Sequence, residues 1–207
     1  MAGLPNPSSD SEIRVHIVQS FLAGNVDVAQ AFYSHPKILV AALNGPAVGL
    51  SAALVACADF VYATPHAFLL TPFSSLGLVT EGVASFALVE RLGISKANEA
   101  LIMSKRITCE ELVATGFVNK VFSAPSGKVE DSAGFLAQVL KELDERLGSH
   151  LNPGSMLGIK ALIRRPGRDA MEKMNIIEAF AGVDRFLSGA PQEEFKKISS
   201  GKKKHKL

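Results

Sequence analysis

Apolar side chains recur at helical spacing in the first part of the chain. Ile13, Ile17 and Phe21 lie four residues apart, which predicts a helix over residues 11–23. The pattern resumes over residues 26–34, and Pro36 bounds this second helix.

A continuous apolar run over residues 38–43 has the pattern of a buried strand. Gly45-Pro46 follows as a turn, and the small residues 51–58 predict a helix that starts near Leu50. This order of strand, turn and helix indicates an α/β fold class.

The rest of the chain is mainly helical in pattern. Thr108-Cys109-Glu110-Glu111 matches a capping box, and Gly116 ends the helix that it opens. After a loop at residues 123–127, the pattern predicts further helices at residues 132–147, 153–163 and 170–186 and a short one from 191. The chain is long enough, at 207 residues with 47% hydrophobic, for one globular core with a helical C-terminal region.

The net charge of +2 comes from the C-terminal tail. Six lysines follow the last acidic residue, Glu194, so the preceding body carries 2 − 6 = −4. This distribution argues against a nucleic-acid partner, and no apolar run is long enough for a membrane span. The five histidines and two cysteines lack ligand spacing, so no metal site is expected; Cys57 and Cys109 are expected to be buried thiols.

Glu81 is a lone carboxylate among apolar residues. Burial raises a carboxyl pKa toward the working pH, which suits a general base. The alternative is a first-turn residue of the helix that follows, stabilised by the helix dipole. Taken alone, this residue fits the structural alternative at least as well.

Gly49 and Leu50 stand where the glycine-rich turn meets the predicted helix. Free N–H groups at a helix start can bind an anion, and the glycine lets a ligand approach the backbone. A carbonyl oxygen held there would be stabilised as an oxyanion. A packing turn rich in glycine is the alternative.

Together these segments resemble the crotonase (enoyl-CoA hydratase/isomerase) superfamily. The motifs that carry the resemblance are Asn44-Gly45-Pro46-Ala47-Val48-Gly49, Cys57-Ala58-Asp59, Phe68-Leu69-Leu70-Thr71-Pro72-Phe73, Leu76-Gly77, Arg91-Leu92-Gly93 and Ala114-Thr115-Gly116-Phe117-Val118-Asn119. The resemblance runs from about residue 11 to 197 and is strongest to fungal peroxisomal Δ3,Δ2-enoyl-CoA isomerases. It implies a ββα spiral core, an acyl-CoA thioester substrate, and no cofactor, since CoA is part of the substrate.

The resemblance also implies roles for single residues. Hydratases of the family use two glutamates, and here Ala53 and Phe73, which follows Pro72, stand at those positions. A single carboxylate suits a 1,3-proton shift, in which Glu81 moves a proton from C2 to C4 of a 3-enoyl-CoA while the Leu50 N–H holds the thioester oxygen. Gly49, Ala53, Pro72 and Phe73 would then border the substrate.

Further expectations rest on the same resemblance. Asn25 matches an asparagine near the substrate, although helix capping explains it equally. Lys160 could reach a CoA phosphate, but a solvated lysine fits as well. The family forms trimers, often paired into hexamers, so a homo-trimer or hexamer is expected.

His205-Lys206-Leu207 resembles a variant of the peroxisomal Ser-Lys-Leu address. A peroxisomal location and an import-receptor partner follow from it; a random basic tail is the alternative. Within the basic tail at residues 196–207, the stretch of Ser199-Ser200-Gly201 and the lysines that follow is expected to be solvated and mobile.

The expected organisation is a disordered lead-in at 1–10, a shortened crotonase-like core at 11–125, a helical region at 126–195 and the basic tail. Family members normally have opening strands before the helix at residue 11, and these supply a second oxyanion N–H. Without them the chain would be a shortened isoform or an incomplete gene model. Two functions therefore stand: an enoyl-CoA isomerase, or a non-catalytic remnant that binds acyl-CoA or joins oligomers.

Overall fold

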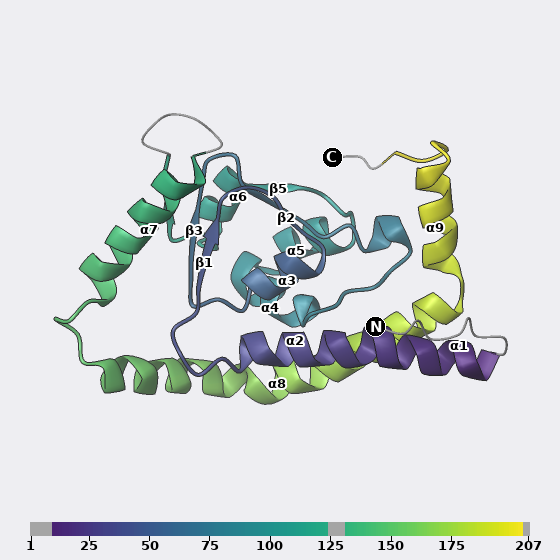
Figure 1. Ribbon diagram of the computed structural model, residues 1–207, viewed down its shortest axis with the longest axis horizontal. Coiled ribbons are helices and arrows are strands. Elements are labelled where there is room, and N and C mark those ends of the chain that lie inside the picture. Colours follow the sequence, from purple (N-terminus) through teal and green to yellow (C-terminus); the bar gives the residue numbers. More distant parts are fainter. Residues whose placement is uncertain (1–9, 124–130, 205–207) are drawn as a thin grey trace.

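The computed structural model describes residues 10–123 and 131–204 (Figure 1). Two small sheets and short helices form a core that longer helices surround. The elements are, in chain order, α1 (Asp10–Ile17), η1 (Val18–Leu22), α2 (Ala23–Tyr33), β1 (Val40–Leu43), β2 (Ala47–Val48), α3 (Leu50–Val55), β3 (Phe60–Ala63), β4 (Phe68–Leu70), η2 (Ser74–Leu76), α4 (Ala84–Leu92), α5 (Ile94–Leu101), β5 (Ile107–Thr108), α6 (Cys109–Ala114), β6 (Lys120–Val121), α7 (Ser132–Leu147), α8 (Pro153–Leu187) and α9 (Ala190–Ser199).

Both sheets have three strands among the described residues. In the first, β3 lies between β1 and β6 and is parallel to both, with Val40 opposite Phe60 and Tyr62 opposite Lys120. In the second, β4 lies between a parallel β2 and an antiparallel β5. The apolar run at 38–43 thus becomes β1, as its pattern predicted, and the α/β class is confirmed.

Small side chains let the core helices approach the sheets and one another. Ala52 and Ala53 of α3 and Ala84 and Ala87 of α4 are almost fully buried. A second cluster forms where Phe135 and Val139 of α7 pack on Tyr62 of β3. None of the described helices is long and apolar enough to span a membrane.

The N-terminal helices differ from the expected pair. Residues 10–33 run through α1, η1 and α2 without the expected interruption around residue 24. The middle piece, η1, is a π-helix, which accommodates one extra residue per turn. Packing against α8 holds the stretch together and outweighs the low helix propensity of Gly24.

The C-terminal helices also join where a break was expected. α8 is a single helix of 35 residues that continues through Pro166. A proline removes one helical hydrogen bond, but α8 contacts α1, η1, α2 and α4 along its length, so tertiary packing keeps the helix intact. In Figure 1, α8 lies alongside α1 and α2 across the base of the core. The expected helix at 132–147 and the capping box at Thr108 are confirmed.

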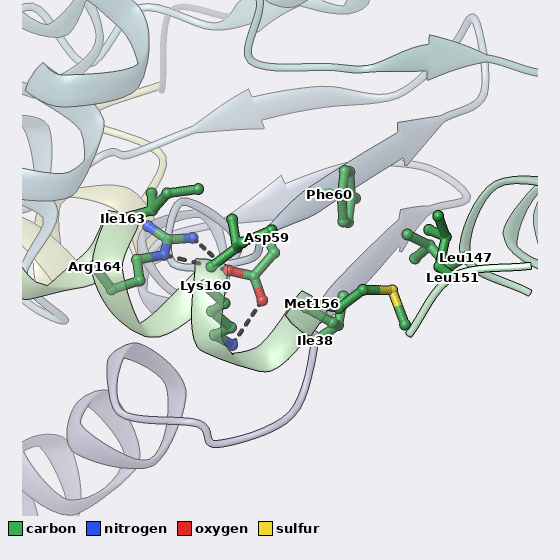
Figure 2. A pocket seen from close by; sticks show the side chains of 10 residues that line it. Ile38, Asp59, Phe60, Leu147, Leu151, Met156, Lys160, Ile163 and Arg164 are labelled. Atoms are coloured by element: carbon green, nitrogen blue, oxygen red, sulfur yellow. Dashed lines mark hydrogen bonds and ion pairs between the residues drawn. The ribbon is translucent and has the colours of Figure 1, made fainter. Parts of the chain in front are cut away.

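A partly buried ion cluster joins the first half of α8 to the core (Figure 2). Asp59, just before β3, lies 2.6 Å from Lys160 Nζ and 3.0 Å from an Arg164 nitrogen. Burial opposes ionisation of Asp59, but donors from Leu39, Lys160 and Arg164 outweigh it and lower the pKa of the carboxyl. Lys160 is therefore neither a solvated lysine nor one free to reach a phosphate, because Asp59 and the Lys37 carbonyl hold it.

Most described residues of the tail are exposed, as expected, but the tail also contacts the core. α9 continues to Ser199, and Lys203 contacts both Glu194 and the carbonyl of Ser75 in η2. These contacts hold the chain against the core up to residue 203. Residues 1–9 of the lead-in expected at 1–10 and the tripeptide His205-Lys206-Leu207 lie outside the described residues, whereas Asp10 already begins α1.

Candidate active site

Gly49 turns the chain sharply from β2 into α3. Its φ of 63° and ψ of −129° are rarely adopted by residues with a side chain, and its N–H donates to Leu70 O at 2.8 Å. Leu50 is the first residue of α3, where an N–H has no carbonyl partner within its own helix. The turn can therefore offer the Leu50 N–H to a carbonyl oxygen of a ligand.

The turn that carries Glu81 packs directly against this helix start. A Cβ placed on Gly82 would lie 2.7 Å from Leu50 Cδ1 and 3.2 Å from Ala53 Cβ. Only a glycine at this position, with φ of 67°, allows such an approach. The local sequence Glu81-Gly82 thus sets the carboxylate beside Leu50.

Glu81, Leu50 and Asn25 line one cavity of about 380 Å³, together with Ser20, Phe21, Gly24, Leu78 and Phe186. These residues come from η1, α2, α3, the loop before α4 and the end of α8. Glu81 is the only ionisable side chain among them. The cavity therefore combines one carboxylate, one helix start and largely apolar walls.

Burial raises the pKa of Glu81, because the charged carboxylate loses water. Asn25 Nδ2 donates to Glu81 Oε2 at 2.7 Å, which favours the charged form and opposes this rise. The negative charge of Glu178 on α8 adds to the rise. Glu81 is thus a carboxylate that accepts a proton more readily than one in water, held in place by a single amide.

A search against known families matches residues 17–147 to the enoyl-CoA hydratase/isomerase family. The chain belongs to this family. A protein of Pyricularia oryzae named Delta(3,5)-Delta(2,4)-dienoyl-CoA isomerase is 63% identical over 92% of the chain and 68% of its own length. The 3,2-trans-enoyl-CoA isomerase of Saccharomyces cerevisiae is 39% identical over 92% of the chain and 67% of its own length.

A solved structure of the same family supports the fold. The enoyl-CoA hydratase/isomerase from Pseudoalteromonas atlantica T6c superposes with a TM-score of 0.76 at 25% identity. The match covers 86% of this chain and 68% of that one. The crotonase-like core predicted from the motifs is confirmed.

This member of the enoyl-CoA hydratase/isomerase family keeps three predicted site residues deeper than expected. Ala53 is fully buried, Phe73 is 2% exposed, and Pro72 is buried. None of the three lines the Glu81 cavity in the part of the chain that the structure describes. Ala53 instead packs near Gly82, where an added Cβ would lie 3.2 Å from Ala53 Cβ, so the small size of Ala53 allows the Glu81 turn to approach α3.

Asn25 is also corrected in one respect. It lies inside the continuous helix, between η1 and the rest of α2, so it does not cap a helix. Its amide reaches Glu81 instead. Asn25 and Glu81 line the same cavity, and the role near the substrate that the resemblance implied for Asn25 stays a prediction.

Sequence reasoning missed the aromatic wall of the cavity. Phe21 on η1 and Phe186 on α8 meet edge to face, with ring centroids 4.9 Å apart. Phe21 belonged to a recognised apolar stripe, but a stripe does not distinguish a core residue from a cavity residue. Phe186 carried no local signal, because its place depends on the unbroken course of α8.

No group of side chains among residues 10–123 and 131–204 has the arrangement of a metal site. Cys57 and Cys109 are both free thiols and buried, as expected. Burial raises the pKa of Cys57 to about 11, so it is a protonated packing residue at neutral pH.

Proposed function

We propose that this chain is a Δ3,Δ2-enoyl-CoA isomerase that converts 3-enoyl-CoA into 2-trans-enoyl-CoA, as in fatty-acid β-oxidation. The observation that carries the proposal is a single carboxylate, Glu81, in a largely apolar cavity beside the helix start at Leu50. Relatives that are named enoyl-CoA isomerases support the same reaction class.

The proposed reaction moves one proton. Glu81 removes a proton from C2, and the electrons of that bond form the dienolate, with negative charge on the thioester oxygen. The Leu50 N–H donates to this oxygen, and loss of such a donor typically costs about 100 to 1000-fold in rate. Protonated Glu81 then returns the proton at C4, which leaves the double bond between C2 and C3 and restores the thioester carbonyl.

The polar groups of the site suit this cycle. A raised pKa lets Glu81 hold the proton between the two steps, and the Asn25 amide fixes the carboxylate so that it can face C2 and C4 in turn. Water addition would need a second group to activate the water or to protonate the substrate, and among the described residues Glu81 is the only ionisable side chain that lines the cavity. The reaction needs no cofactor, because CoA arrives with the substrate.

A second candidate reaction comes from the 63% identical relative, whose name specifies a dienoyl-CoA isomerase. That reaction would move a proton from C2 to C6 of a 3,5-dienoyl-CoA. C2 and C6 are farther apart than C2 and C4, so one carboxylate serves both ends poorly. The single carboxylate of the cavity therefore favours the shorter shift.

Location and assembly are part of the proposal. His205-Lys206-Leu207 would bind a peroxisomal import receptor and place the enzyme in peroxisomes. Leu162 and Ile163 on α8 are 68% and 69% exposed, and a trimer or hexamer would cover such apolar surface.

The test compares three substrates on one preparation of the chain. We expect conversion of 3-hexenoyl-CoA to 2-trans-hexenoyl-CoA, slower turnover of a 3,5-dienoyl-CoA, and negligible hydration of 2-trans-hexenoyl-CoA. Faster turnover of the dienoyl substrate would assign the chain to the second reaction. Thioester binding without turnover of either substrate would identify a non-catalytic acyl-CoA-binding protein.

A further inference from the structure

The backbone directly after Glu81 is in an uncommon conformation. Gly82 and Val83 are both left-handed, with φ of 67° and 60°. A glycine adopts such angles freely, but a β-branched valine there is strained. Val83 is also fully buried. Strain of this kind persists only where the surrounding structure holds it.

The start of α4 lacks the usual local support. Val83 is the N-cap residue, and its apolar side chain accepts no hydrogen bond from the helix. A polar N-cap would accept from the N–H of the second or third helical residue. Here the second residue is Ser85, and its N–H donates to Glu178 Oε1 at 2.8 Å.

Glu178 thus occupies the place of a missing cap, although it lies 93 residues further along the chain. It belongs to α8 and is 3% exposed, so its carboxylate sits inside the protein. Burial raises the pKa of the Glu178 carboxyl, and its hydrogen bond with Ser85 opposes that rise. The bond therefore links α8 to the turn that carries Glu81.

We propose that Glu178 is a positioning residue, which holds the strained Gly82–Val83 turn and thereby keeps Glu81 against Leu50. The inference rests on the proposed role of Glu81 as the base. The turn has little room on its other side, because even a Cβ added to Gly82 would lie 2.7 Å from Leu50 Cδ1 and 3.2 Å from Ala53 Cβ. Release at Ser85 would let Val83 relax and shift the Glu81 carboxylate away from the reacting carbons.

The decisive variants are Glu178→Gln and Glu178→Met, which have nearly the same size. Glutamine keeps an oxygen that accepts the Ser85 N–H, whereas methionine fills the space without an acceptor. A shift of the base by about 1 Å can cost about 100-fold in rate, so we expect Glu178→Met to lower kcat by about that factor with little change in KM. Glu178→Gln should retain most of the wild-type kcat.

Glu172 supplies the matched control on the same helix. Its carboxylate is exposed and pairs with Arg168 at 2.7 Å. Glu172→Met should leave kcat and KM at wild-type values. A loss of kcat in Glu172→Met equal to that in Glu178→Met would show a general effect on α8 and overturn the proposal.

Hydrogen exchange at the Ser85 amide tests the same contact without catalysis. We expect slow exchange in the wild type and Glu178→Gln, and faster exchange in Glu178→Met. Fast exchange in the wild type would refute the contact, and wild-type kcat in Glu178→Met would refute its role. A wild-type protein with a protected Ser85 amide but no isomerase activity would retain the contact and reject the proposed function instead.

Discussion

Loss of the Asn25 amide should move the acid limb of the pH–rate profile to higher pH. Asn25 is 6% exposed and donates to Glu81 Oε2 at 2.7 Å, which favours the ionised carboxylate. Hydrogen bonds to charged groups are worth about 1.5 to 3 kcal/mol, so Asn25→Ala removes that much stabilisation from the base form. Since this contact lowers the pKa of Glu81, its loss raises that pKa further above the ordinary value.

The assay is kcat/KM for 3-hexenoyl-CoA across the acid range, because this ratio reports the free enzyme. Ser20→Ala is the control: Ser20 lines the same cavity, but its hydroxyl donates to His16 O at 2.7 Å and not to Glu81. Its acid limb should match the wild type. An unchanged acid limb in Asn25→Ala would refute the reasoning that this amide stabilises the charged base.

Three further predictions concern stability and location. Glu81 has a raised pKa in the folded state, so its ionisation lowers the stability of the fold as pH rises through that pKa. Glu81→Gln should therefore raise the melting temperature at pH 8 but not at pH 4. Equal gains at both pH values would contradict this. Asp59→Asn should lower the free energy of unfolding by about 1.5 to 3 kcal/mol in urea titrations, since Lys160 and Arg164 lose their charged acceptor. The control Asp144→Asn should leave the free energy of unfolding unchanged. Equal losses in the two variants would contradict the role of the Asp59 ion cluster in stability. Deletion of residues 205–207 should shift a fluorescent fusion from punctate organelles to the cytosol without loss of turnover, and unchanged puncta would reject the targeting role.

The sequence predicts the features of this fold that depend on short stretches of chain. The apolar run of β1, the capping box at Thr108 and the helix start at Leu50 each follow from a few neighbouring residues. The motifs also indicated the family, because their order and their spacing along the chain, from the glycine turn to Glu81, make the pattern specific.

Features set by distant contacts were not predictable in the same way. Pro166 and Gly24 are breaking signals locally, yet α8 and α2 continue through them because the two helices pack on each other. The Glu178 contact joins residues 93 positions apart, so no local pattern shows it. Likewise Ala53 and Phe73 were expected to line the substrate pocket, but in the folded chain both are buried and neither lines the Glu81 cavity.

The most direct test of the account is the rate of conversion of 3-hexenoyl-CoA by Glu81→Gln. The amide keeps the shape of the side chain and can still contact Asn25, but it cannot accept the C2 proton. We predict a fall in kcat of at least about 100-fold, the loss expected for a general base, with unchanged binding of the CoA thioester. Conversion at close to the wild-type rate would show that Glu81 is not the base and would contradict the proposed function of the cavity.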